Sequence, residues 1–314
     1  MTDIVLRSVQ NRADQRRFLT FPWKIYQKDP LWVPPLLPER MDMLDPQKGV
    51  FVQRGDVELF MAYQGDRLVG TICVGEDPPT NLNRGTKECV FGFLEYIQDY
   101  DVFQSLLSKA QEWGRERGLD TLYGPWNLDY ENGYGVLVEG RDAPPALMCG
   151  HTPPYYSEFM DRFGFQPARA QNVALRITLE ETPQIRRLSR LADRIRSKGQ
   201  VQVRKANFDR WSEEVDIVHG LLGKALAHLS DSIGWHRDAL EATLAPFKTI
   251  ADPELILFAE VGGRTVGFLP GIPNLNEIFT DVNGLRYPWN YLQLLWLMKV
   301  RKPASLSVKS VLVL

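Results

Sequence analysis

A polar and aromatic stretch between Trp126 and Gly135 holds side chains of the types that bind and activate polar substrates. Asn and Tyr offer hydrogen-bond donors and acceptors, and a carboxylate such as that of Glu131 can take a proton from a substrate as a general base. The side chains predicted to contact a substrate here are those of Trp126, Asn127, Tyr130 and Asn132. Asn and Asp also bond their own backbone in turns, so a purely structural loop is the alternative.

Two adjacent tyrosines form a second candidate group, because Tyr155 and Tyr156 open a predicted helix that Gly164 ends. Neighbouring residues of a helix point in different directions, so we expect the ring of Tyr156 to face a cleft and that of Tyr155 to face the core. The alternative is that both rings pack in the core. His151 lies just before this helix and is a further candidate for substrate binding, although a lone His there is more often a structural residue.

An α/β core is predicted to position these side chains. The apolar run Cys89–Leu94 has the length and aromatic content of a buried strand. Asp101 to Arg117 carries apolar residues at helical spacing, and Thr121 to Asn127 forms a short strand that runs into a loop. A strand, a helix and a second strand in this order favour two parallel neighbours in one sheet. Ligand sites usually lie at the carboxyl ends of such strands.

Composition and charge exclude several classes of protein. The net charge of −2 predicts no global attraction to nucleic acid. The three cysteines are far apart and fit neither a zinc site nor a disulfide framework, so we expect no metal and a reducing, cytoplasmic location. The first residues lack the features of a signal peptide, and no run of 18 apolar residues is present.

The sequence contains an internal repeat. The segment 60–70 aligns with 257–267 at an offset of 197, and five of the eleven positions are identical. The same offset carries a predicted first strand around Arg7 onto Val201–Arg204, and Asn81–Asn83 recurs as Asn274–Asn276. Chance similarity between two β-hairpins is the alternative, but three features in similar order favour a duplication.

The repeat predicts three parts in the chain. These are an N-terminal domain over 1–182, a connecting helix over 183–199 and a partial second domain over 200–314. The connecting helix has an apolar stripe and a very basic opposite face, which favours a solvated helix over an anion-binding surface.

Two segments near the C-terminus suggest contacts with other molecules. The run 306–314 reads as a strand without a covering helix, so either a partner, such as a second copy in a homo-oligomer, covers this edge or the chain is a fragment. The segment 287–302 reads as an aromatic, apolar helix that ends in three cations. Burial against its own sheet is the favoured interpretation, and peripheral membrane or acyl-chain contact is the alternative.

Several of these segments resemble a known superfamily. The segment Pro154–Phe165, with its aromatic pair and final Gly-Phe, resembles the late helix of the GNAT superfamily of acyl-CoA N-acyltransferases. The segments Asp29–Leu36, Gly124–Asn127 and Gly135–Gly140, and the stretch 283–302, are similar to a bacterial group of tandem GNAT-like proteins. The resemblance implies an α/β fold with two GNAT-like mixed β-sheet domains and flanking helices, the second incomplete within this sequence.

The resemblance also implies how coenzyme A would bind. The superfamily holds the pyrophosphate with a glycine-containing loop at a helix N-terminus, where free N–H groups favour anions. In the first copy the matching residues Glu95–Gln104 contain no glycine, and Asp101 with Gln104 reads as a capping box. In the second copy the loop would follow Leu314. We therefore expect acetyl-CoA or acyl-CoA to be a co-substrate only if the second domain is completed.

The resemblance assigns roles to two of the candidates. The tyrosine that commonly protonates the leaving thiolate matches Tyr155 or Tyr156, of which we favour Tyr156. Glu131 is the candidate base that deprotonates a small-molecule amine acceptor. The sequence thus predicts a GNAT-like acyltransferase of unknown acceptor that lacks its own CoA site in this chain. The alternative is a non-catalytic binding or dimerisation module on the same scaffold.

Overall fold

The computed structural model describes residues 3–128, 135–168, 170–225, 237–245, 248, 251–308 and 311–314. The chain forms two compact units. Unit 1 comprises Met1–Ala168 and Asn274–Pro303, and unit 2 comprises Arg169–Pro273 and Ala304–Leu314. This division differs from the ranges expected from the sequence, because 274–303 groups with the first unit. The indole of Trp23 donates to Asn283 Oδ1 at 2.6 Å, and Asn274 Oδ1 accepts from the Leu147 N–H at 3.0 Å.

Unit 1 contains a five-stranded mixed sheet in the order β1-β2-β3-β4-β5. Its strands are β1 (Ile4–Ser8), β2 (Asp56–Gln64), β3 (Arg67–Glu76), β4 (Glu88–Tyr96) and β5 (Thr121–Tyr123). The first four strands pair antiparallel, whereas β4 and β5 run parallel and are connected through α6 (Tyr100–Glu116). The predicted strand–helix–strand core is therefore confirmed.

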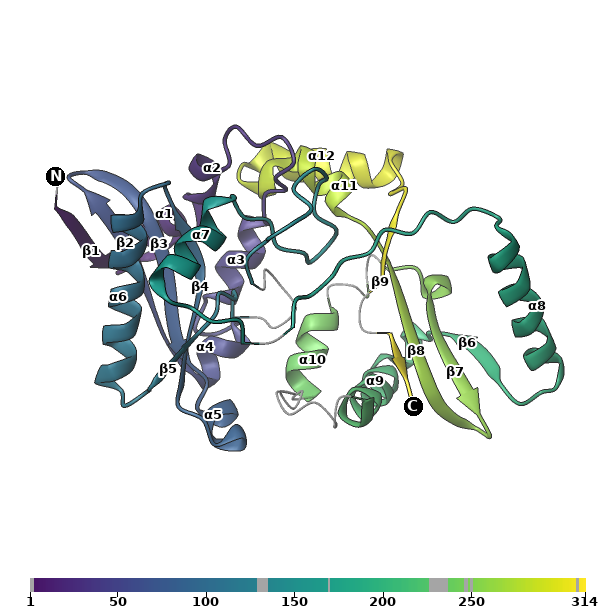
Figure 1. Ribbon diagram of the computed structural model, residues 1–314. Helices are drawn as coiled ribbons and strands as arrows, with labels where there is room; N and C mark the ends of the chain where they lie inside the picture. The colour runs from purple at the N-terminus through teal and green to yellow at the C-terminus, as the bar shows by residue number, and fades with distance from the viewer. Residues whose placement is uncertain are drawn as a thin grey trace. The chain divides into compact units, whose positions relative to one another are not determined.

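Each face of this sheet is covered by helices, because alternate residues of a strand point to opposite faces. Phe60 and Ile72 belong to a core beneath α6 and α7 (Tyr155–Phe163), while Met61 and Cys73 pack on the other side with helices from the N-terminal segment (Figure 1). The remaining helices of unit 1 are α1 (Arg12–Thr20), α2 (Pro22–Ile25), α3 (Leu37–Met43), α4 (Val50–Arg54), α5 (Pro78–Arg84), α11 (Asn276–Phe279), η4 (Thr280–Leu285) and α12 (Pro288–Val300).

Unit 2 contains the second five-stranded sheet, in the order β10-β8-β7-β6 with β9 paired to β8. The strands are β6 (Gln202–Lys205), β7 (Ile256–Val261), β8 (Arg264–Pro273), β9 (Leu306–Val308) and β10 (Leu312–Val313), and the described helices are α8 (Pro183–Ser197), η1 (Phe208–Arg210), α9 (Trp211–Ala225), α10 (Arg237–Leu244) and η3 (Pro253–Leu255). Phe258 and Phe268 pack against Val215 and Leu222 of α9. Together the two units confirm the predicted α/β class with two sheets and flanking helices. Among the described strands only the first sheet is mixed, because every strand pair of the second sheet is antiparallel.

The two sheets share one strand register, which supports the internal repeat. Ala62 pairs with Gly70 in unit 1, and Ala259 pairs with Gly267 in unit 2, so the pairs are related by the offset of 197. Each hairpin also has its irregularity immediately after the paired alanine, at Ala62/Tyr63 and at Ala259/Glu260. The shared register and the shared bulge favour a duplication over chance similarity in turn residues.

The strand predicted over 306–314 is present as β9 and β10, both paired to β8. The side chains of Leu306, Val308 and Val313 are exposed. The homo-oligomer expected to cover this edge stays a prediction.

Candidate active site

Strand β4 departs from regular geometry at Gly92 and Phe93, and this irregularity brings the loop after β5 against it. Phe93 has a φ of 45°, which is rare for a residue with a side chain. Its N–H donates to Asn127 Oδ1 at 2.7 Å, and Trp126 N–H donates to Phe91 O at 2.9 Å. A Cβ on Gly92 would lie 1.7 Å from the Trp126 carbonyl oxygen, so only glycine allows this close contact.

A small cavity of about 60 Å³ lies beside this irregularity. It is large enough for ordered water or a small polar group, but not for a long aliphatic chain. Two charged side chains line it, those of Glu95 and the buried Arg40. The other lining residues are Phe18, Leu19, Pro22, Pro35, Thr71, Phe93 and Asn127.

Glu95 is the chemically unusual group of this cavity. Its Oε2 accepts a hydrogen bond from the Tyr156 hydroxyl at 2.8 Å. Burial raises the pKa of Glu95 from 4.5 to about 7, although hydrogen bonds from Tyr156 and Tyr26 act in the opposite direction. A carboxyl group with a pKa near neutrality can both accept and donate a proton at physiological pH, which is what a general base requires.

Tyr156 lies in the core instead of facing a cleft as expected. Its side chain is 1% exposed and stacks on Tyr96, with ring centroids 4.3 Å apart. The Tyr156 hydroxyl also accepts from the Tyr96 N–H at 3.2 Å, and Tyr155 donates to the Tyr96 carbonyl at 2.6 Å. Both tyrosines therefore brace β4, and Tyr156 reaches the cavity only through its hydrogen bond to Glu95.

His151 belongs to a hydrogen-bonded group that approaches Glu95 from the other side. His151 Nε2 lies 2.7 Å from Asp29 Oδ2, and the His151 carbonyl accepts from the Tyr26 hydroxyl at 3.1 Å. Tyr26 is buried and stacks on Trp32, with ring centroids 4.9 Å apart. Burial raises the pKa of Asp29, but hydrogen bonds from His151 and from backbone N–H groups more than offset this effect and lower it overall. These contacts hold Tyr26 in place beside Glu95.

The predicted polar loop is described only in part. Tyr130, Glu131 and Asn132 lie outside the described residues, so their predicted roles stay predictions. Trp126 is fully buried and packs edge-on against Phe51, in the core and not at a surface where it could bind substrate. Asn127 lines the cavity, as a substrate-binding residue must.

Sequence reasoning missed Glu95, Tyr26 and Arg40 as site residues. The available signal was the position of Glu95 itself, one carboxylate within the apolar and aromatic run Cys89–Ile97. A charged residue in a strand that is otherwise buried needs a partner or a function.

The N-terminus of α6, where the resemblance would place the pyrophosphate of CoA, is filled by the protein's own side chains. Asp99 Oδ1 accepts from the Asp101 N–H at 2.9 Å, so Asp99 is the cap and not Asp101 as predicted. Gln64 donates to the other carboxylate oxygen of Asp99 at 3.3 Å. Two acidic residues at this point oppose a bound pyrophosphate, so the residues present do not fit that group.

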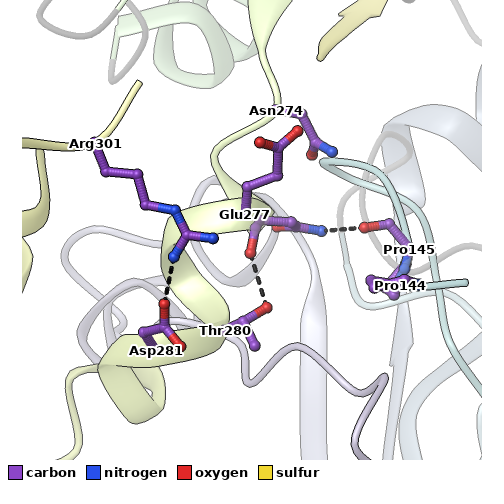
Figure 2. A pocket seen from close by; sticks show the side chains of 8 residues that line it. Pro144, Pro145, Asn274, Glu277, Thr280, Asp281 and Arg301 are labelled. Carbon is purple, nitrogen blue, oxygen red and sulfur yellow. Dashed lines mark hydrogen bonds and ion pairs between the residues drawn. The ribbon is translucent and has the colours of Figure 1, made fainter. Parts of the chain in front are cut away.

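A larger cavity of about 240 Å³ also lies within unit 1. Figure 2 shows Arg301 directed toward Asp281. The distance between Arg301 Nη1 and Asp281 Oδ2 is 2.6 Å, and the Asn276 amide donates to the Pro145 carbonyl at 2.9 Å. Arg301 and Asp281 are each about half exposed, and exposed ion pairs of this kind perturb chemistry little. The Glu95 cavity is therefore the better candidate for catalysis.

Helix α12 exposes most of its apolar side chains, contrary to the favoured expectation of burial against its own sheet. Trp289, Leu292, Leu295 and Trp296 are each more than 60% exposed, whereas Asn290 and Leu297 are buried. No helix within the described residues is long and apolar enough to cross a bilayer, and no group of three or more potential metal ligands is found among the same residues.

Two five-stranded sheets with flanking helices, the first of which carries the Glu95 site, define an α/β protein. No protein-family model matches the sequence. The chain is 31% identical over 310 residues to the bacterial ceramide synthase of Caulobacter vibrioides, a match that covers 98% of this chain and 79% of that protein. The chain therefore belongs to the same protein family as this ceramide synthase.

Two further proteins show similarity. Protein YghO of Escherichia coli is 28% identical over 302 residues, with 94% of this chain and 75% of that protein covered. A solved structure of a tandem GNAT protein from the clavulanic acid biosynthesis pathway, without AcCoA, has a TM-score of 0.43 and 12% identity over 85% of this chain and 73% of its own.

Proposed function

We propose that the protein is an N-acyltransferase whose acceptor is the amine of a long-chain amino alcohol. The observation that carries the proposal is Glu95, a carboxyl group with a pKa of about 7 on a cavity of unit 1. The relation to a ceramide synthase supports the substrate class, since a ceramide is the amide of a fatty acid and a long-chain amino alcohol.

The chemistry of amide formation explains why such a carboxyl group is useful. An amine is protonated at neutral pH and must lose a proton before its nitrogen can attack an acyl carbonyl carbon. The Glu95 carboxylate accepts that proton, and the nitrogen then forms the C–N bond while the bond from the acyl carbon to its leaving group breaks. The second proton lost from the nitrogen passes to the leaving group. The Tyr156 hydroxyl donates a hydrogen bond to the carboxylate at 2.8 Å and limits the movement of its oxygens during the transfer.

We assign the cavity to the head group of the acceptor because of its small volume. About 60 Å³ accommodates an amine with its adjacent hydroxyl group, while the aliphatic chain must lie outside. The exposed aromatic face of α12 is the surface of unit 1 that we assign to such a chain or to the membrane that contains it.

The acyl donor is not assigned to the N-terminus of α6, because Asp99 occupies that position. By resemblance the donor is acyl-CoA, and no step of the proposed mechanism depends on where it binds. The same capped helix favours the second candidate function, a module of this scaffold that binds the amine without turnover.

The test is an amide-forming assay with the purified 314-residue chain, a long-chain 2-amino alcohol and acyl-CoA donors of several chain lengths, with the product detected by mass spectrometry. Glu95→Gln is expected to lower turnover by about 10²-fold or more, as the loss of a general base does. Glu158→Gln alters an exposed carboxylate of α7 and serves as the matched control.

Absence of amide product with every donor would reject the transferase in this chain. If the amine nevertheless stabilises the protein against unfolding, the binding module is the correct function. If Glu95→Gln has undiminished turnover, the protein is still a transferase but Glu95 is not its general base.

A further inference from the structure

Helix α8 of unit 2 has an apolar face that no described part of the chain covers. Every residue of α8 is exposed except Ala192, which is half-buried. Leu188 is 64% exposed and Leu191 is 51% exposed, and Ile185 and Ile195 are also exposed. At 100° per residue these four side chains and Ala192 lie on one stripe about 120° wide.

The helix is nevertheless well defined by its own sequence. The Thr182 side chain accepts from the Ile185 N–H at 3.2 Å, and Pro183 occupies the first turn, where its missing N–H costs nothing. The last turn carries Arg194 and Arg196, which interact favourably with the helix dipole. These features favour the helix without requiring contact with a core.

Positive charge covers the rest of its surface. Between 183 and 198 the only acidic residue is Asp193. The same segment contains five arginines and one lysine, at positions 186, 187, 190, 194, 196 and 198. The described ion pairs of this helix, Arg186 with Glu181 at 3.5 Å and Arg196 with Asp193 at 3.8 Å, are exposed and weak. Because the whole chain has a net charge of −2, this concentration of cations is local.

We propose that α8 docks the protein on the surface of an anionic phospholipid bilayer. The helix lies in the plane of the interface, with Ile185, Leu188, Leu191 and Ile195 in the outer acyl region and the arginines at the lipid phosphates. Charge complementarity selects this partner, since the cations flank the apolar stripe and their long stems reach the phosphates on either side. A nucleic acid would use the cations but leave the apolar stripe exposed to water.

The proposal is independent of the reaction proposed above, because it depends only on unit 2 and needs no substrate. The test is co-sedimentation of the 314-residue chain with vesicles of phosphatidylcholine containing 30% phosphatidylglycerol, compared with vesicles of phosphatidylcholine alone, at 150 mM salt. Binding to the anionic vesicles is expected, with little binding to the neutral ones.

Two double variants separate the charge from the apolar stripe. Arg190→Gln with Arg194→Gln is expected to weaken partitioning roughly 30-fold, as the loss of two interfacial cations implies. Leu188→Ser with Leu191→Ser, made separately, is expected to abolish most of the binding to anionic vesicles. Leu82→Ser is the control for an exposed leucine outside α8, since Leu82 is 83% exposed, and it should bind as the unchanged protein does.

Three results would overturn the proposal. The first is equal binding to neutral and anionic vesicles. The second is binding that survives both double variants, which would place the contact elsewhere, for example on α12. The third is no binding to the anionic vesicles. If the protein is then a dimer in sedimentation velocity that Leu188→Ser with Leu191→Ser dissociates, the occupant of the stripe is a second copy of the chain.

Discussion

Replacing Glu95 by Gln should change how the stability of unit 1 depends on pH. Below pH 4.5 the carboxyl group is neutral in both the folded and the unfolded chain, so it has no effect on the pH dependence. Between pH 4.5 and about 7 the unfolded chain loses this proton while the folded chain keeps it, and stability therefore falls as the pH rises. The difference between the two pKa values corresponds to about 3 kcal/mol once the pH exceeds 7.

Gln keeps the shape of the side chain and can still accept the hydrogen bond from Tyr156, but it does not titrate. Relative to the unchanged protein, Glu95→Gln should therefore gain about 3 kcal/mol of unfolding free energy between pH 4 and pH 8. Glu158→Gln, which removes an exposed carboxylate, should show no comparable gain.

The cysteines of the protein allow this measurement to be made on unit 1 alone. Cys73 and Cys89 are buried in its core, and the third cysteine, Cys149, also belongs to unit 1 and can be replaced by Ser. Urea unfolding is followed by the reaction of the two buried thiols with dithiodipyridine at each pH. A difference between Glu95→Gln and the unchanged protein that stays constant from pH 4 to pH 8 would refute the perturbed carboxyl group.

Two further substitutions test how β4 is held. Tyr156→Phe removes a hydrogen bond that lowers the pKa of Glu95, so this pKa should rise further in an NMR titration. The free energy of unfolding of unit 1 should fall by about 1–3 kcal/mol, because the Tyr96 N–H also loses its acceptor. A fall in the pKa of Glu95 would contradict the geometry. Gly92→Ala places a methyl group against the Trp126 carbonyl and should cost at least about 2 kcal/mol in urea unfolding, whereas Gly220→Ala, in open space on α9, should cost nothing; equal stability of the two alanine variants would show that the β4 contact is loose.

The elements of the core were predictable from sequence because their signals are local. Apolar spacing over 101–117 located α6 to within one residue at each end, and the similarity between 60–70 and 257–267 identified the repeated hairpins. Such patterns depend on the periodicity of a helix or the chemistry of a turn, which the surrounding tertiary structure rarely overrides.

The candidate site was less predictable because it depends on contacts between distant segments. The pKa of Glu95 rises because the fold buries its carboxyl group, and the residues that surround it, such as Tyr26 and Tyr156, are far from it in sequence. The cap at Asp99 and the left-handed Phe93 likewise follow from how β4 meets its neighbours. The exposure of α12 was not predicted, because an apolar composition alone suggests burial. Only the packing of α12 against η4 shows which side of the helix faces outward.

The common register of the two sheets allows strands of one copy to compete for pairing with strands of the other copy during folding. Leu6 of β1 pairs with Ala62, and Val203 of β6 pairs with Ala259, so each edge strand meets its own hairpin at the equivalent alanine, and the other hairpin offers the same register. On the ribosome, β1, β2 and β3 are synthesised before β6 exists, and the first sheet can pair its own strands without competition. When a denatured full-length chain refolds, all of these strands are present from the start. Refolding in the test tube is therefore expected to exchange strands between copies and to proceed more slowly than synthesis in the cell.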